Sequence, residues 1–302
     1  MIRRRLVTLV PTVLGVVTLV FLLVHLVPGD PVDVMLGETA NPADKAALRA
    51  ELGLDRPLAE QYLGYLAGVA RGDLGRSILY RRPVAELLAA RIPATLELSA
   101  AALAVALILA VPLGVAAARR KDTAVDRGSL VASLLGVSIP NFWLGPLLVL
   151  AFSVHLRWFP VSGRAGWASL VLPAVTLGTA LAAMLTRMLR SSLVEVLGAE
   201  YLTAARARGV GEGRVLWVHA LRNALLPVIT VLGLQMGSLL SGAVVTEAVF
   251  SWPGLGTLLL QAIHGRDYPL VQGCVLVISL GYVGVNLLAD WAYRWADPRV
   301  RG

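Results

Sequence analysis

SSLVEVLGAEYLTAARARGVGEGRVLWVHALRNALLP, residues 191–227, is the stretch around which this chain is organised. It separates two long apolar segments and is itself too charged to cross a bilayer. Leu193, Leu197, Tyr201 and Ala204 recur at a spacing that places them on one face of a helix. We therefore predict a first short amphipathic helix here.

A second short helix is predicted after a glycine-rich break. Val215, Val218, Leu221 and Leu225 again share one helical face. Glycines at 209, 211 and 213 separate the two helices, and glycine interrupts helices readily. A helix–glycine–helix elbow of this kind predicts a docking surface for another protein. The alternative is an amphipathic helix that rests on anionic lipid, but the alanines around residue 204 favour protein packing.

The composition is that of a membrane protein. Of 302 residues, 57% are hydrophobic and 15% charged, and the mean hydropathy is +0.73. The net charge of +8 comes from arginines at the ends of apolar segments, so we expect a lipid bilayer and no nucleic acid as partner. The single cysteine, Cys274, excludes a disulfide within the chain.

The apolar segments predict an all-α membrane protein with six transmembrane helices. The first, residues 6–27, has 22 residues and would be about 33 Å long as a helix. We interpret it as a retained helix because no signal-peptide cleavage pattern follows it. The six segments are 6–27, 95–118, 129–155, 170–189, 226–249 and 270–292.

Basic residues predict the orientation. If each segment spans once, one side of the membrane receives the basic N-terminus, the link at 119–127, the elbow and the basic tail. The short links on the other side hold only Arg157, Arg164 and Arg266. The positive-inside rule therefore puts both termini and the elbow in the cytoplasm.

We divide the chain into three parts. Residues 1–94 comprise the first helix and a long extracytoplasmic loop. Residues 95–292 form a five-helix transport domain with a cytoplasmic coupling loop at 190–225. Residues 293–302 form a cytoplasmic tail.

Polar residues inside the predicted spans are candidates for a solute pathway, because polar groups at membrane depth face the protein interior. Packing of small residues explains the serines equally well. The candidates for the pathway or a gate are Asn141, Gln235, Ser238, Ser241 and Glu247.

Residues near the segment ends have simpler expected roles. Glu247 could contact an outer partner or form a gate, or it could be a hydrated charge. Glu97 at the start of the second segment suits the helix dipole. The tryptophans at 158, 252 and 291 are predicted to lie at the membrane interface.

Several kinds of chemistry are excluded. Neither of the two lysines, Lys45 and Lys121, follows a glycine, so no phosphate-binding loop is present and the chain should not split ATP itself. The four histidines are scattered, and we expect no metal site. No motif marks a nucleophile with its base. We therefore expect neither an enzyme nor a cofactor.

The elbow resembles the cytoplasmic EAA loop of permease subunits of ATP-binding-cassette importers. The family pattern is E-A-A-x-x-x-G, followed after nine residues by I-x-L-P. Here Gly209 aligns with the glycine and Thr203-Ala204-Ala205 with E-A-A. Thr203 replaces the glutamate and Arg222 replaces the proline.

Both departures resemble one subfamily, the dipeptide/oligopeptide/nickel permeases, and in particular their first or "B" subunit. The resemblance extends along nearly the whole chain in order. The matching stretches are HLVPGDPV at 25–32, RGDLGRS at 71–77, SIPNFWLG at 138–145, FPVSG at 159–163, LPAVTLG at 172–178, GAVVTEAVFSWPGLG at 242–256 and DPRVR at 297–301.

The resemblance implies a type I ABC importer permease fold in the bacterial inner membrane. It implies four partners or groups of partners: a second homologous permease subunit, two cytoplasmic ATPase subunits, an extracytoplasmic solute-binding protein and the bilayer. The solute would be a di- or oligopeptide, or a related solute such as a nickel or metal chelate. The elbow would dock on one ATPase, and the residues expected to couple are Glu200, Tyr201, Thr203, Ala204, Ala205, Arg206, Arg208, Gly209 and Arg222.

The strongest alternative is a secondary, ion-coupled transporter. Such a protein would be expected to show an inverted repeat and ionisable residues at mid-membrane, and neither is visible in the sequence.

Overall fold

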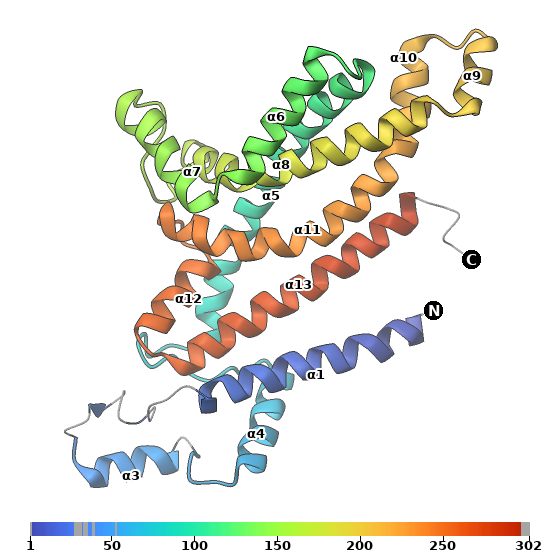
Figure 1. The fold of residues 1–302 in the computed structure, drawn as a ribbon. Coiled ribbons are helices and arrows are strands. Elements are labelled where there is room, and N and C mark those ends of the chain that lie inside the picture. Colours follow the sequence, from blue (N-terminus) through green and yellow to red (C-terminus); the bar gives the residue numbers. More distant parts are fainter. Residues whose placement is uncertain (1, 27–31, 33–35, 38–39, 52, 297–302) are drawn as a thin grey trace. The chain divides into compact units, whose positions relative to one another are not determined.

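The computed structural model describes residues 2–26, 32, 36–37, 40–51 and 53–296, and the regular elements within them are helices (Figure 1). Some side chains, including those at 238, 241 and 291, lie outside the described part. The elements are α1 Ile2–Leu26, α3 Pro42–Glu51, α4 Leu58–Arg71, α5 Val84–Arg119, α6 Ala124–Ser138, α7 Asn141–Leu148, η1 Val149–His155, α8 Trp167–Leu197, α9 Glu200–Ala207, α10 Glu212–Arg214, η2 Val215–Ala220, α11 Leu221–Val249, α12 Leu255–His264 and α13 Tyr268–Ala296. The all-α prediction is confirmed for this part of the chain.

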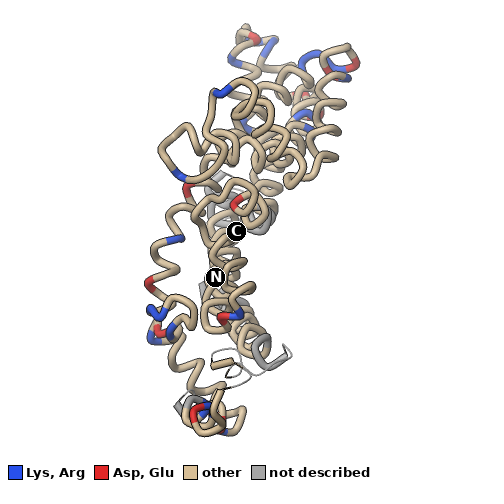
Figure 2. Tube along the Cα trace, turned by 90° about the vertical axis from the view of Figure 1, so that its left-hand side faces the viewer, with Lys and Arg blue, Asp and Glu red and all other residues tan. Residues whose placement is uncertain are grey.

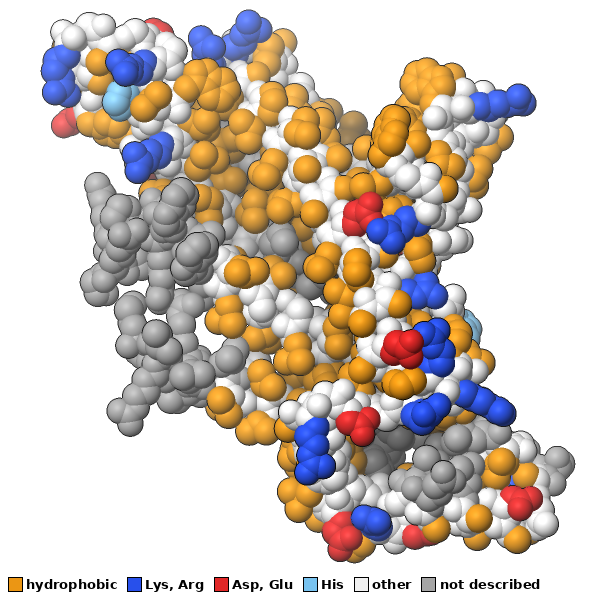
Figure 3. All heavy atoms as spheres, turned by 180° about the vertical axis from the view of Figure 1, so that it is seen from behind, with side chains coloured by type: hydrophobic (Ala, Val, Ile, Leu, Met, Phe, Trp, Pro, Cys, Tyr) orange, Lys and Arg blue, Asp and Glu red, His pale blue; other side chains and the backbone are white. Residues whose placement is uncertain are grey.

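Four helical stretches of the described chain are long and apolar enough to cross a membrane, and a bent pair raises the number to five. The stretches are Val84–Arg119, Trp167–Leu197, Glu212–Gly233 and Tyr268–Ala289, and the pair is Ala124–Ser138 with Asn141–His155. In α1 the stretch Val10–Leu22 is apolar but shorter. Six spans therefore remain a prediction. Exposed apolar side chains such as Ile108 and Leu134 are suited to lipid contact, and hydrophobic side chains spread over the face drawn in Figure 3.

The chain divides into two compact units. The first comprises residues 1–93 and 254–281, and the second comprises residues 94–253 and 282–302. Helices α5 and α13 each contribute to both units.

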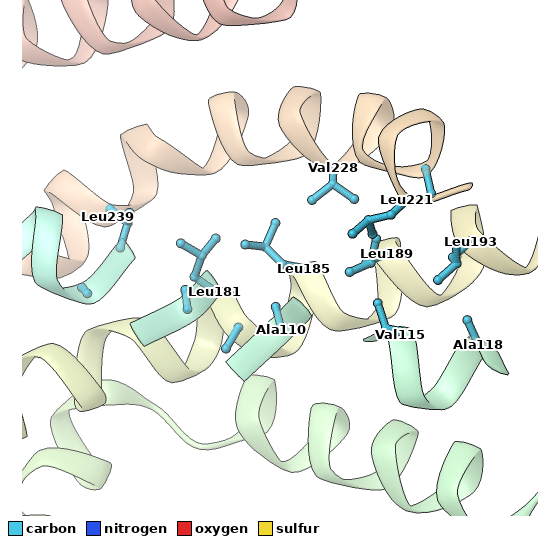
Figure 4. Close-up of a cluster of buried hydrophobic side chains, with 14 of the residues drawn as sticks. Ala110, Val115, Ala118, Leu181, Leu185, Leu189, Leu193, Leu221, Val228 and Leu239 are labelled. Carbon is cyan, nitrogen blue, oxygen red and sulfur yellow. The ribbon is translucent and has the colours of Figure 1, made fainter. Parts of the chain in front are cut away.

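Helix α8 lies at the centre of the second unit. Its buried leucines recur every four residues and face α5 and α11 (Figure 4). The leucines are Leu181, Leu185, Leu189 and Leu193. On α5 the facing residues are small, with Ala102, Ala106 and Ala110 at most 1% exposed. Small residues allow close helix approach, and a Cβ built on Gly178 of α8 would lie 2.6 Å from the carbonyl oxygen of Ala102.

The predicted third span is broken in the middle. Helices α6 and α7–η1 meet at an angle of 102°. The break falls at Ile139–Pro140, where Ile139 is extended (ψ 114°) and Pro140 precedes the first residue of α7. Proline has no N–H and restricts the residue before it to extended conformations. The structure therefore places a sharp bend inside the predicted span 129–155.

Two expectations about residues near segment ends were also wrong. Helix α5 begins at Val84, so Glu97 lies in its interior and pairs with Arg164 at 2.6 Å rather than stabilising a helix N-terminus. Trp252 is fully buried instead of lying at the membrane interface, and its indole N–H donates to the Ala94 carbonyl at 2.8 Å. The Arg164 guanidinium lies 5.9 Å from the Trp252 ring centroid.

In the first unit, Asp267 organises the loop that precedes α5. Its buried carboxylate accepts hydrogen bonds from the Ser77 hydroxyl at 2.5 Å and the Leu79 N–H at 3.0 Å. The same side chain accepts a hydrogen bond from the Leu270 N–H at 3.2 Å, and Asp267 thereby caps the N-terminus of α13. One aspartate therefore fixes the RGDLGRS segment to a helix start.

Candidate functional site

The elbow consists of three short helical pieces rather than two helices. The first predicted helix does not run through residues 193–204, because α8 ends at Leu197 and α9 begins at Glu200. Leu193 and Leu197 thus belong to α8, and Tyr201 and Ala204 belong to α9. The link at Gly198 and Ala199 makes α9 a separate helix of eight residues.

Gly209 ends α9 in a Schellman motif. Its φ of +79° is left-handed, its N–H donates to Arg206 O at 2.9 Å, and the Val210 N–H donates to Ala205 O at 3.2 Å. This pair of bonds satisfies carbonyls that would otherwise lack partners at the helix end. A glycine is favoured here because other residues are strained at positive φ. Gly213, by contrast, lies inside α10, so it does not break a helix.

A π-helical segment changes which side chains are buried in the second half of the elbow. In η2, Val215–Ala220, each turn takes up an extra residue. Val215 and Leu221 are buried as predicted, but Val218 is 52% exposed. Buried positions instead follow Val215, Ala220 and Ala224, spaced five and then four residues apart.

Helix α9 has one anchored face and one free face. Leu202 and Ala205 are 0% and 7% exposed, and Leu202 belongs to the same core as α8 and α11. Ala205 therefore faces the chain's own interior, and its part in coupling stays a prediction. The exposed stripe, at helical spacing, consists of Glu200, Thr203, Ala204 and Ala207.

Cations surround this exposed stripe. Arg206 pairs with Glu212 at 2.8 Å across the turn. Arg208 and Arg222 are exposed, and no carboxylate of the described residues lies in an ion pair with either. Figures 1 and 2 show the elbow and the α5–α6 link, both rich in arginine, at the same end of the second unit. This surface suits an acidic protein partner.

A hydrogen-bond brace joins α9 to α11. The Asn223 amide donates to the Tyr201 hydroxyl at 2.8 Å and to the His219 carbonyl at 3.1 Å. The Tyr201 hydroxyl also donates to the His219 carbonyl, at 3.4 Å. The brace therefore ties α9 to the start of α11.

Two of the pathway candidates meet in one cavity. It has a volume of about 280 Å³ and lies among α6, α7, α8 and α11. Asn141 and Gln235 line it, and Arg187 is its charged residue. The other lining residues are Val137, Leu177, Ala180, Leu181, Met184 and Leu239. Arg187 was not predicted as a lining residue, because its place at the end of an apolar segment indicated only topology. Ser238 and Ser241 lie outside the described side chains.

Glu247 is fully buried, so the expectation of a hydrated charge was wrong. Its carboxylate accepts the Thr95 hydroxyl at 2.6 Å, which joins α11 to α5. Its backbone carbonyl accepts a hydrogen bond from the backbone N–H of Trp252 at 2.8 Å. A buried side chain offers no surface to an outer partner, while a role as a gate stays a prediction.

Several apolar helices, a partly polar cavity among them and an exposed elbow are features of a membrane transport subunit. The chain belongs to the family described as the inner membrane component of binding-protein-dependent transport systems. That family matches residues 110–302, and its N-terminal counterpart matches residues 1–99.

Relatives that align over nearly the whole of both chains are permease proteins. The chain is 45% identical to the dipeptide transport system permease protein DppB of Escherichia coli K12, over 99% of this chain and 98% of the relative. It is 44% identical to the di/tripeptide permease DppB of Pseudomonas aeruginosa, with the same coverage. It is also 44% identical to the glutathione permease GsiC of Salmonella choleraesuis, over 99% and 97% of the two chains.

A solved structure shares the fold. A chain of the inward-facing MetNI methionine ABC transporter superposes with a TM-score of 0.59 at 18% identity, covering 70% of this chain and 96% of that one. The predicted resemblance to ABC importer permeases is confirmed, and nothing found supports a secondary transporter. The chain is a permease subunit and not an enzyme, and ATP hydrolysis belongs to a separate subunit.

Proposed function

We propose that this chain forms half of the solute pathway of an ATP-driven importer of short peptides in a bacterial inner membrane, and that the elbow docks on a separate ATPase. The observation that carries the proposal is the two-faced helix α9. Leu202 anchors one face in the core of α8 and α11, while Thr203, Ala204 and Ala207 leave the other open.

The small exposed residues of α9 suit close helix packing in a groove. Alanine side chains let two backbones approach, and Arg208 and Arg222 at the edges can pair with acidic groups of the ATPase. Through the Tyr201–Asn223 brace, a push on α9 reaches α11, which contributes to the cavity. ATP binding elsewhere can thus bias one of two arrangements of the membrane helices.

The peptide class is drawn from the relatives. Proteins of nearly equal identity to this chain carry dipeptides, di- and tripeptides or glutathione. Identity thus does not select among these solutes, but all are short peptides with free carboxylates. We favour this class over a metal chelate.

The remaining partners and the topology belong to the same proposal. A second permease subunit would complete the pathway, and an extracytoplasmic binding protein would deliver the solute. Six spans with cytoplasmic termini would put the elbow beside the ATPase. The arginines gathered at one end of the second unit support that orientation.

The test is reconstitution of the complex in proteoliposomes with its ATPases, second permease and binding protein. Uptake of a labelled dipeptide should require ATP, and the isolated chain should hydrolyse none. Replacement of exposed Ala204 by tryptophan should block docking and abolish uptake. The same change at Ala46, exposed on α3 in the loop predicted to be extracytoplasmic, should preserve at least half of it. Full uptake with A204W would refute the docking role, and absence of peptide uptake in the unchanged complex would refute the peptide class.

A further inference from the structure

The cavity among α6, α7, α8 and α11 has a lining suited to an anionic solute. Its charged group is the Arg187 guanidinium. Asn141 and Gln235 add two amides, and the other lining side chains are apolar. Mostly apolar walls with a few converging polar groups are typical of small-molecule sites.

Arg187 has no charge partner among the residues that the structure describes. The contrast is Arg190, one turn further along α8, whose guanidinium is bonded twice by Asp126. No carboxylate is among the residues that line the cavity. Arg187 is half-buried in an apolar setting, and an unpaired charge there raises the free energy of the empty site. Binding of an anion beside the guanidinium would therefore be favourable.

Arg187 lies near the elbow-side edge of the membrane region. It lies 20 residues beyond the start of α8 at Trp167, which is about 30 Å along a helix and close to the thickness of the hydrocarbon layer. Leu177, halfway along, lines the same cavity. The cavity therefore extends from mid-membrane depth toward the end of α8 that leads to the elbow.

We propose that this cavity binds the carboxylate end of the transported solute, with Arg187 as the anion receptor. A guanidinium fork matches a carboxylate with two parallel hydrogen bonds. Asn141 and Gln235 are placed to bond polar atoms of the same solute. A volume of about 280 Å³ is at the lower limit for ligand sites and suits the end of a short peptide. The proposal rests on the peptide importer proposed above.

The site is tested by binding to the purified complex of permeases and ATPases without the binding protein. Saturation-transfer NMR would compare glycylleucine with glycylleucine amide, which lacks the carboxylate. The unchanged complex should show signal from the free acid and about tenfold less from the amide, as expected for loss of a charge-assisted bond. Arg187→Gln should remove this preference. Arg187→Lys should keep only part of it, because an ammonium keeps the charge but lacks the fork of two donors. Arg190→Gln should leave it intact.

Two results would overturn the site. One is an equal signal from both peptides in the unchanged complex, or a free-acid preference that survives Arg187→Gln. The other is dissociation of the R187Q complex on gel filtration, which would make Arg187 an intersubunit contact. Peptide uptake by vesicles that carry the unchanged complex separates these failures from failure of the peptide function itself.

Discussion

The Arg190 guanidinium of α8 donates two hydrogen bonds to the Asp126 carboxylate near the start of α6, at 2.9 and 2.6 Å. The carboxylate also accepts the Asp122 N–H at 2.9 Å. Asp126 is buried, while Arg190 is partly exposed. The pair therefore fixes the α5–α6 link to the end of α8 from which the elbow emerges.

This ion pair predicts a specific pH dependence. Hydrogen bonds from Arg190 and from the Asp122 N–H lower the pKa of Asp126 below its usual 3.8. A carboxyl whose pKa is lower in the folded state stabilises the fold above the unfolded pKa, and that stability is lost as pH falls through the folded pKa. The thermal midpoint of the purified protein should therefore drop more between pH 5 and pH 3 than that of Asp126→Asn, in which this group does not titrate. Parallel pH profiles of the two proteins would contradict the role of the pair.

Substitution by alanine should change the stability of the fold in opposite directions at two glycines inside helices. A Cβ at Gly178 would lie 2.6 Å from the Ala102 carbonyl oxygen of α5, whereas nothing lies within 4 Å of one at Gly128 of α6. We expect Gly178→Ala to destabilise by about 1 to 3 kcal/mol through overpacking. Gly128→Ala should stabilise by about 0.5 to 1 kcal/mol, because alanine favours helix more than glycine does. Unfolding in mixed detergent micelles measures both, and equal effects would mean that α5 and α8 do not pack this closely.

The sequence predicted the helical segments well because apolar length and periodicity are local properties. The segment 170–189 lies within α8, and 226–249 lies within α11. Local signals failed where the backbone departs from regular helix. A proline indicates that a helix can kink, but it does not predict a bend of 102°. A π-helical turn such as η2 has no sequence signature, so the exposure of Val218 was not predicted.

The candidate site was predicted only in part, because burial and cavities arise from elements distant in sequence. Asn141 and Gln235 were each chosen for being polar inside an apolar segment, yet their meeting in one cavity depends on how α7 packs on α11. Arg187 was missed as a site residue for the same reason. Glu247 looked accessible from its place near a helix end, but it is fully buried and its carboxylate accepts the Thr95 hydroxyl of α5.

The buried contact between Thr95 and Glu247 should matter for stability. Thr95→Val removes a donor to a carboxylate that water does not reach, so we expect a loss of about 1 to 3 kcal/mol. Thr95→Ser keeps the hydroxyl and should restore most of the stability. Thr230→Val is a matched control, because Thr230 is exposed and bonds only within its own helix. The idea fails if T95V and T230V unfold at the same detergent concentration.

Gly209 supplies the sharpest test of the elbow, because its role depends on its left-handed backbone conformation. Alanine at a φ of +79° costs about 1 to 2 kcal/mol, although nothing lies within 4 Å of the new methyl group. The strain should unwind the end of α9 and turn its exposed stripe away from the ATPase. Such a penalty corresponds to a 5- to 30-fold loss of the docked state.

We therefore expect Gly209→Ala to lower peptide uptake and transport-coupled ATP hydrolysis by roughly that factor, while the membrane helices unfold as before. Gly213→Ala is the matched control. It lies a few residues away in α10 at an ordinary φ, with open space around it, and should leave uptake unchanged. Equal uptake by both variants would show that the Schellman turn does not position α9, and an equal loss in both would point to added bulk in the elbow rather than to backbone strain.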